Sequence, residues 1–347
     1  MNIEERKIAF VQLGKVLRNF VVNKDWEGFD SGLTETEHND FNQLILKSKT
    51  LNGWFTEENV RKAIEGIVNL LDSDRLDEWL ATYQFDSEKN KNVGVIMAGN
   101  IPMVGFHDAL CVLLSGNKLV GKLSSEDKLL IPAVLEFLIR IEPQFKTKIS
   151  FVERIKEIDA VIATGSNNSA RYFETYFGKY PNIIRKNRTS IALITGNETE
   201  EELTSFANDV FLYFGKGCRN VTKVLVPKEY DLDNLFKAFY PFKDIIHHHK
   251  YANNYDYNKA IYMMSQTPII ENGFLMLIEN DALHSPLSIL NYQYYNDKSE
   301  ALAYTEVHKD ELQCIVGSDY IPFGKAQMPD ADDYADGEDT MKFLLSL

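Results

Sequence analysis

One cysteine, Cys218, lies in a sequence context that could make it a nucleophile. It belongs to the stretch YFGKGCRN, in which glycines flank Lys216 and Arg219 follows the cysteine directly. Positive charge near a thiol favours the thiolate, which is the nucleophilic form. The alternative is an inert thiol after a turn, because free cysteine often behaves as a small buried hydrophobe. Cys111 and Cys314 lie in apolar stretches and are expected to be core residues.

The cysteines and histidines do not form a metal-ligand pattern. Three widely spaced cysteines in 347 residues are typical of reduced thiols, not of a disulfide framework or a zinc site. The run HHHK at residues 247–250 is not predicted to bind metal, because three consecutive side chains point in different directions. We therefore expect no metal site.

Small and polar residues follow three β-rich runs, at places where helices are expected to begin. These segments read AGNIPMVG, GKLSSED and TGSNNSA, and the first contains Asn100. Backbone N–H groups at the start of a helix bind anions readily, so a phosphate-bearing cofactor is the expected occupant. The Asn100 amide could donate a hydrogen bond to a developing oxyanion, or it could simply cap a turn.

The order of the elements predicts how these loops are held. Apolar residues recur at helical spacing over residues 56–83, with a break near 72–74, and residues 1–90 are expected to be mainly helical. From Val93 onward, β-rich runs alternate with helical segments that begin near Met103, Asp127, Asn168 and Thr199. This alternation is typical of βαβ units on a parallel sheet, which bind ligands at the carboxyl ends of their strands.

Length and composition narrow the possible functions. A chain of 347 residues is expected to form two domains, or one domain with a large appendage. The net charge of -14 argues against a nucleic-acid-binding surface. The start MNIEERKIAF contains acidic residues, and no long apolar run follows, so we expect no membrane span and a cytoplasmic location.

Five motifs, taken in order, resemble the aldehyde dehydrogenase superfamily and, within it, the acyl-CoA reductase branch related to the fatty-acid reductase of bacterial bioluminescence. They are GNIP, GNKLVGKLS, IATGSNNSARYF, YFGKGCRN and IPFGKAQMPDADDYADGEDTMKFL. The resemblance runs from about Val93 to the C-terminus. It implies an α/β, aldehyde dehydrogenase-like fold, with a doubly wound cofactor-binding domain plus a smaller α/β catalytic domain.

The resemblance also implies domain limits and an oligomeric state. Residues 1–190 would form the helical lead-in and the nicotinamide-cofactor-binding domain. Residues 191–315 would form the catalytic domain with Cys218, and residues 316–347 would be a tail that returns to the cofactor domain. Members of the family are usually oligomers, so a homo-oligomer is expected.

Site residues follow from the resemblance, position by position. Cys218 corresponds to the catalytic thiol and Asn100 to the asparagine that points at the substrate oxygen, with the Cys218 backbone N–H as a second donor. Lys122 corresponds to the lysine that contacts the adenosine ribose. Gly165 and Ser166 correspond to the loop beside the cofactor phosphates.

Three departures from the family pattern refine these expectations. In hydrolytic members a glutamate activates the water that releases the acid. In this sequence the corresponding stretch is RKNRTS, with Arg185 near the position of the glutamate, and arginine cannot act as a base. Ser124 and Ser125 replace an acid that usually holds the ribose, which favours NADPH, although Glu126 and Asp127 keep NADH open. Ala282 replaces the glutamate that meets the nicotinamide ribose, and Asp281 is the candidate substitute.

These features together predict an NAD(P)H-dependent reductase that converts an acyl thioester to an aldehyde through an acyl-cysteine. The donor would be acyl-CoA, with coenzyme A as part of the substrate, or an acyl-carrier-protein thioester. One alternative is a cysteine-dependent acyltransferase or thioesterase without hydride transfer, which the altered DALHSP segment motivates. Another is a conventional aldehyde dehydrogenase, and the least favoured is a noncatalytic scaffold.

Overall fold

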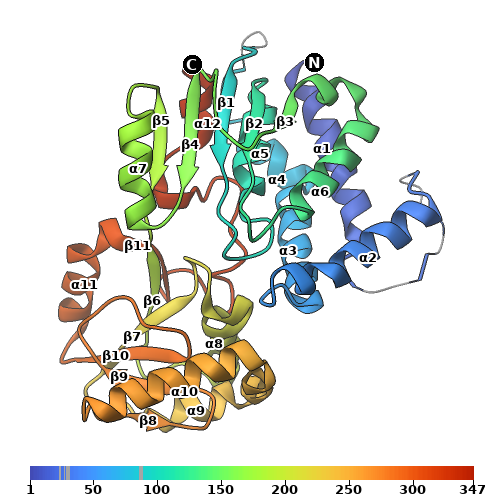
Figure 1. Cartoon of the computed structure of the whole chain (residues 1–347). Coiled ribbons are helices and arrows are strands. Elements are labelled where there is room, and N and C mark those ends of the chain that lie inside the picture. Colours follow the sequence, from blue (N-terminus) through green and yellow to red (C-terminus); the bar gives the residue numbers. More distant parts are fainter. Residues whose placement is uncertain (23–24, 27, 29–31, 86–88) are drawn as a thin grey trace. The chain divides into compact units, whose positions relative to one another are not determined.

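The computed structural model describes residues 1–22, 25–26, 28, 32–85 and 89–347. The chain divides into two compact units (Figure 1). Unit 1 comprises Met1–Asn187 and Pro329–Leu347, and unit 2 comprises Arg188–Met328. None of the helices in the described part of the chain is long and apolar enough to cross a membrane.

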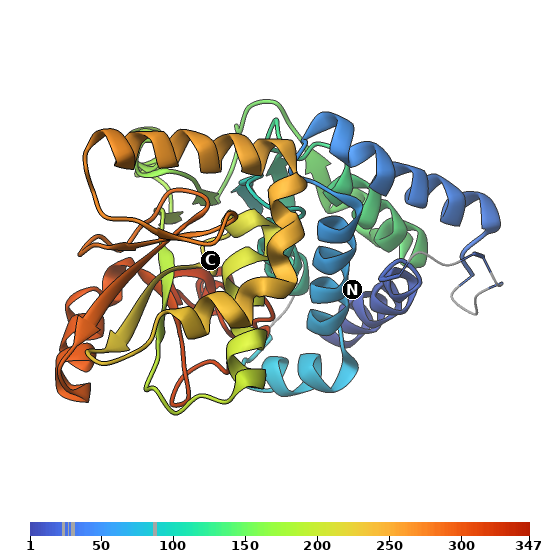
Figure 2. The same cartoon turned by 90° about the horizontal axis from the view of Figure 1, so that it is seen from below.

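Four helices open unit 1, and polar caps determine where they begin. They are α1 (Ile3–Arg18), α2 (Glu35–Leu51), α3 (Glu57–Leu70) and α4 (Ser73–Leu80), and they form the blue group in Figure 2. Thr56 caps α3, and the Asp72 carboxylate accepts the N–H groups of Asp74 and Arg75 at the start of α4. An N-cap carboxylate pairs N–H groups that a helix leaves unbonded, so the predicted break near residues 72–74 is confirmed.

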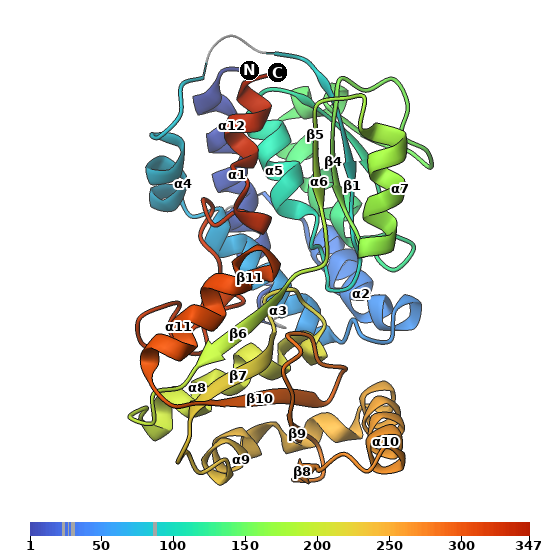
Figure 3. The same ribbon diagram turned by 90° about the vertical axis from the view of Figure 1, so that its left-hand side faces the viewer.

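The sheet of unit 1 is fully parallel and has the strand order β3-β2-β1-β4-β5. Its strands are β1 (Asn92–Ile96), β2 (Lys118–Lys122), β3 (Ile149–Phe151), β4 (Ala160–Thr164) and β5 (Asn182–Arg185). The associated helices are α5 (Phe106–Leu114), α6 (Leu130–Ile141), α7 (Asn167–Phe177) and α12 (Thr340–Leu345). Figure 3 shows α5 and α7 on opposite sides of the strands, as the doubly wound prediction requires.

Unit 2 contains a six-stranded sheet with the order β11-β6-β7-β10-β9-β8, parallel except for the β8–β9 pair. Its strands are β6 (Thr189–Leu193), β7 (Val221–Pro227), β8 (Ile270–Glu271), β9 (Met276–Glu279), β10 (Ile289–Tyr295) and β11 (Leu312–Val316). Its helices are α8 (Glu200–Phe211), α9 (Asp233–Phe239), α10 (His249–Met264) and α11 (Lys298–Val307). The β-rich run from Ser190 therefore belongs to this second sheet.

Apolar side chains cover both faces of the unit 2 sheet. On one face, Val224 and Val226 of β7 pack in a cluster with Phe206 of α8 and Phe239 of α9. On the other face, Leu225 belongs to a separate cluster with residues of β6 and α11. A strand that is buried on both faces reads as a continuous apolar run, and the sequence VLV in β7 follows this pattern.

A buried ion pair joins three elements of unit 1. Arg185, the last residue of β5, donates from Nη1 to both carboxylate oxygens of Asp108 in α5, at 2.8 Å each. Its Nη2 donates to the Thr340 hydroxyl of α12 at 2.8 Å. Both charged side chains are less than one-tenth exposed. The arginine that the sequence places near the usual position of a general base is thus engaged in structural contacts.

We expect Arg185→Met to lower the free energy of unfolding by about 3 to 5 kcal/mol, because the buried Asp108 carboxylate would lose its counter-charge. Adding Asp108→Leu should recover part of this loss, since both charges are then absent. Urea unfolding followed by circular dichroism measures both effects.

The matched control is Arg75→Met, which removes the half-exposed partner of Asp330. A surface pair of this kind contributes about 1 kcal/mol or less. If Arg185→Met cost no more than this control, the ion pair would not be a structural determinant of unit 1.

Candidate active site

Cys218 lies in a tight turn between the end of the α8 segment and β7. The Asn220 N–H donates to the Gly217 carbonyl at 3.1 Å, which places Cys218 and Arg219 at the two corners of the turn. The Cys218 carbonyl accepts from the Ser190 hydroxyl of β6 at 3.0 Å. The Cys218 side chain is partly buried, so it is neither a core residue like Cys111 nor fully exposed.

The turn is tied to the segment that the sequence writes as IPFGKAQ. Arg219 donates from Nε to the Ala326 carbonyl at 2.5 Å. The buried Asp209 carboxylate accepts the N–H groups of Gly324 and Ala326, at 2.6 and 2.9 Å. Burial raises the pKa of Asp209 to about 6. Two motifs that are about one hundred residues apart in sequence therefore form one hydrogen-bonded assembly within unit 2.

Asn100 lies in the loop after β1, with its side chain exposed. The predicted helix begins at Phe106, later than Met103, because Met103 adopts a left-handed backbone conformation with φ of 56°. The Met103 N–H donates to the buried carboxylate of Asp127 at 2.8 Å. A side chain of the loop after β2 thus holds the loop that carries Asn100.

Lys122 ends β2, and the two serines follow it. A Cβ atom on Gly99 would lie 2.5 Å from the Ser124 hydroxyl oxygen, so only glycine permits this approach of the β1 and β2 loops. Ser125 and Glu126 are exposed. Asp127, in contrast, accepts N–H groups from Met103 and Leu130, and burial raises its pKa.

Gly165 and Ser166 follow β4, directly before α7. The Ser166 hydroxyl accepts the Ser169 N–H at 3.2 Å and forms the N-cap of the helix. In the strand order, β4 lies beside β1 on the side opposite to β2, so the chain changes direction in the sheet at the β1–β4 pair. Doubly wound sheets bind ligands in the crevice at this point, outside the carboxyl ends of the strands. The loops that carry Asn100 and Gly165 follow these two strands.

Asp281 belongs to a loop between β9 and β10, and polar side chains of the sheet and of α11 donate hydrogen bonds to the carbonyl groups of this loop. Five consecutive carbonyls, from residue 280 to residue 284, accept hydrogen bonds from four side chains, one of which is Tyr304, whose hydroxyl donates to Asp281. Lys223 Nζ donates to Asn280 and Asp281, Thr222 Oγ1 to Leu283, and Asn291 Nδ2 to Ala282 and His284. The Asp281 residue itself is exposed. This scaffold was not predicted; its signal in the sequence is a lysine inside an apolar strand.

Lys223 is fully buried, and burial lowers its pKa to about 8. Its Nζ lies 2.9 Å from each of its two carbonyl acceptors and 4.5 Å from the centre of the Tyr304 ring. Carbonyl dipoles and an aromatic face both stabilise a desolvated ammonium group. The loop that contains Asp281 is therefore anchored to the sheet through Lys223.

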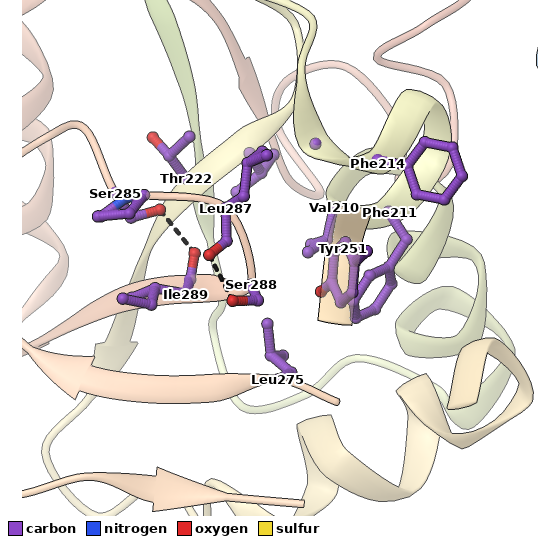
Figure 4. Close-up of a pocket in the computed structure, with 13 residues that line it drawn as sticks. Val210, Phe211, Phe214, Thr222, Tyr251, Leu275, Ser285, Leu287, Ser288 and Ile289 are labelled. Carbon is purple, nitrogen blue, oxygen red and sulfur yellow. Dashed lines mark hydrogen bonds between the residues drawn. The ribbon is translucent and has the colours of Figure 1, made fainter. Parts of the chain in front are cut away.

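A narrow cavity lies between the turn that precedes Cys218 and the loop that precedes β10 (Figure 4). Phe211, Phe214 and Tyr251 lie on one side of it, and the segment from Ser285 to Ile289 lies on the other. The cavity measures about 20 Å³, which accommodates a single water molecule. Its two serine hydroxyls donate to the Ile289 and Leu287 carbonyls, within the same segment.

The predicted site residues form two sets. Asn100, Lys122, Ser124, Ser125, Gly165 and Ser166 follow or end strands of unit 1, and Cys218 and Asp281 lie in unit 2. Within the described ranges, no group of histidine, cysteine, aspartate and glutamate side chains could hold a metal ion. The catalytic and binding roles of these residues stay predictions.

Solved structures of aldehyde dehydrogenases share this fold. Aldehyde dehydrogenase 21 from Physcomitrella patens, in complex with the reaction product succinate, has a TM-score of 0.70 at 12% identity, covering 100% of this chain and 84% of that one. A mutant of the P. syringae indole-3-acetaldehyde dehydrogenase AldA, in complex with NAD+ and IAA, has a TM-score of 0.65 at 13% identity, covering 91% and 72%. The Mycobacterium tuberculosis aldehyde dehydrogenase complexed with NAD+ has a TM-score of 0.63 at 12% identity, covering 91% and 73%.

At such identities the similarity shows the fold, and it confirms the predicted aldehyde dehydrogenase-like architecture. No curated protein matches the sequence. The family profile described as acyl-CoA reductase (LuxC) matches residues 21–237, which is more than half of the chain. This match confirms the predicted resemblance and indicates an oxidoreductase with aldehyde-related, NAD(P)-dependent chemistry. The chain belongs to the acyl-CoA reductase (LuxC) family.

Proposed function

We propose that this protein reduces an acyl thioester to an aldehyde, with acyl-CoA or an acyl-carrier-protein thioester as the donor and NADPH as the reductant. The observation that carries the proposal is the turn at Cys218, where a partly buried thiol lies in a hydrogen-bonded loop of a LuxC-family chain. In this proposal unit 2 is the catalytic part and unit 1 binds the cofactor.

The proposed reaction begins with attack of the Cys218 thiolate on the thioester carbonyl carbon. The Asn100 amide and the Cys218 backbone N–H would stabilise the resulting oxyanion, and one donor of this kind contributes about 3 to 4 kcal/mol. The carbon–sulfur bond to coenzyme A then breaks, coenzyme A leaves as a thiolate, and an acyl-cysteine remains. A bound reduced nicotinamide would supply the hydride that converts the acyl group to the aldehyde, after which Cys218 departs as the thiolate.

The loops of unit 1 fit a nicotinamide nucleotide. The crevice at the β1–β4 pair, the helix N-terminus at Ser166 and the cation Lys122 are typical features of a dinucleotide site. Lys122, Ser124 and Ser125 would hold the adenosine ribose, and Gly165 and Ser166 would contact the phosphates. Asp127 is buried and accepts N–H groups from Met103 and Leu130, so of the two acids only the exposed Glu126 could still select NADH. Ser124 and Ser125, in place of the acid of the family, support NADPH.

Arg185 argues against hydrolysis of the acyl-cysteine by water. Its guanidinium is paired with Asp108, and a cation cannot activate water as a base. An acyl-cysteine that water does not hydrolyse would persist long enough to be reduced. This supports the reductase over a conventional aldehyde dehydrogenase.

A cysteine-dependent acyltransferase or thioesterase is the second candidate. Ala282 stands where the family has the glutamate that meets the nicotinamide ribose, and the exposed Asp281 is its proposed substitute. Transfer of an acyl label from Cys218 to a second thiol, without oxidation of NADPH or NADH, would favour this candidate.

We expect Cys218→Ala to abolish acyl-CoA-dependent oxidation of NADPH, because no acyl-enzyme can form, while NADPH binding is retained. The loss should exceed about a thousandfold, as is typical when a covalent nucleophile is removed. Absorbance of the reduced nicotinamide, with acyl-CoAs of graded length, measures the rate, and isothermal titration measures cofactor binding. Cys314→Ala is the matched control and should stay active; an active Cys218→Ala enzyme would refute the assignment.

We expect Ser125→Asp to raise the KM for NADPH about tenfold or more and to change the KM for NADH little, because the new carboxylate would repel a 2′-phosphate. Steady-state kinetics with both cofactors checks the ratio. Thr147→Asp adds the same charge in an exposed segment before β3, at the amino edge of the sheet, and should leave the ratio unchanged. Equal effects of the two variants would contradict the proposed ribose site.

A further inference from the structure

A buried asparagine two residues after Cys218 is hydrogen-bonded on both sides of its side-chain amide. Asn220 is fully buried, and its Oδ1 accepts the Gly217 N–H at 2.8 Å. Its Nδ2 donates to the carbonyls of Asp209, Val210 and Leu212, at 3.0, 3.3 and 2.9 Å. One amide therefore connects the end of α8 to the Cys218 turn.

The three carbonyls belong to the end of α8, where Leu212 is the C-cap residue. The last carbonyls of a helix lack intrahelical partners, and burial without a partner costs free energy. After α8 the chain does not continue in a regular conformation: Tyr213, Phe214 and Gly215 have φ of 54°, 59° and 77°. Left-handed conformations in non-glycine residues are strained and persist only where the surroundings impose them. Asn220 satisfies the helix end and supports this strained turn.

The two glycines of the motif YFGKGCRN are explained by the same contacts. Gly215 is the third residue in the left-handed region, where glycine carries no steric penalty. A Cβ atom on Gly217 would lie 3.0 Å from Asn220 Oδ1, closer than side chains normally approach, so its absence admits the hydrogen bond. The glycines beside Lys216 thus serve the Asn220 contacts.

The contacts also determine the direction of the Cys218 backbone N–H. The Gly217 carbonyl and the Cys218 N–H belong to one planar trans peptide and point in opposite directions. The Asn220 N–H holds that carbonyl, and Asn220 Oδ1 holds the N–H of the preceding peptide. The next peptide is held through the Cys218 carbonyl, which accepts from Ser190. Every peptide from Gly217 to Arg219 is therefore fixed in orientation.

We propose that Asn220 is a positioning residue that directs the Cys218 N–H toward the oxyanion of the thioester substrate. The inference rests on the proposed function, in which Cys218 is acylated. Without the Asn220 side chain, the Gly217 N–H and three carbonyls lose their partner, and the strained turn relaxes. The thiol and the backbone bond from the Asn220 N–H to the Gly217 carbonyl then remain, but the preceding peptide and the end of α8 are released, so the direction of the Cys218 N–H is held less tightly.

The test compares two reactions of the same thiol. Acylation by octanoyl-CoA passes through an oxyanion, whereas alkylation by iodoacetamide does not, so only acylation depends on the N–H donor. Both rates are measured on Cys218 by quenched-flow sampling and peptide mass spectrometry. We expect Asn220→Ala to lower the ratio of acylation to alkylation at least tenfold, with both rates taken under conditions in which the circular dichroism of the variant matches that of the wild type.

Asn117→Ala is the matched control, because Asn117 is equally buried in unit 1 and donates to Ser115 and Leu344. It should leave the ratio unchanged even if it destabilises the protein. An unchanged ratio in Asn220→Ala would overturn the positioning role and leave the proposed function intact. A wild-type Cys218 that is alkylated but acylated neither by acyl-CoAs from acetyl to palmitoyl nor by the corresponding acyl-carrier-protein thioesters would overturn both.

A measurement on the wild-type protein decides the matter if Asn220→Ala does not fold. The Gly217 amide lies in a loop but is bonded to a buried side chain, so its hydrogen exchange should be slowed at least about a hundredfold relative to an unstructured peptide. Exchange at the unprotected rate would show that the Asn220 contacts do not hold the turn, and would overturn the inference.

Discussion

Carbonyl groups that helices and strands leave without a backbone partner impose the main constraint on unit 2. Each one needs a hydrogen-bond donor, because a desolvated carbonyl without a partner is costly. In this unit the donors are side chains of residues in or next to the central strands: Asn220 serves the end of α8, and Lys223 and Asn291 serve the loop of residues 280–284. Both segments carry residues predicted to act on the substrate or cofactor. Side chains in or next to the sheet thus fix two irregular segments that regular backbone hydrogen bonding does not hold.

The loops of unit 1 that carry candidate site residues are positioned in a different way. These residues lie directly after parallel strands, where the fold itself brings loops to one edge of the sheet. Only short-range devices are then needed, such as the Ser166 cap and the Asp127 carboxylate that holds the Met103 N–H. This difference follows from the local structure. The position of a loop at a strand end is determined by the strand, whereas the turn at Cys218 must be held by its own contacts.

This difference also explains what could be predicted from the sequence. Several elements were predictable, because periodicity and capping residues are local signals. They are the helix break at Asp72, the strands that precede Asn100 and Gly165, and the strand that ends at Lys122. The short strands β3 and β5 were not identified, since three or four residues are too few to establish a period. Asn220 and Lys223 were missed for another reason: an asparagine in a turn and a lysine in a strand are usually exposed. Only the tertiary structure shows that both are buried donors.

Arg185 connects the packing of unit 1 to the choice of reaction. Its charge is neutralised by Asp108, and its second nitrogen holds Thr340 of the C-terminal helix. A glutamate at this position would face the Asp108 carboxylate in a buried environment, where two like charges are strongly unfavourable. Restoring a hydrolytic base there would therefore require a change of partner in α5 as well. In the proposed reaction, the preference for reduction over hydrolysis thus depends on a buried ion pair within the scaffold, and not only on the residues around Cys218.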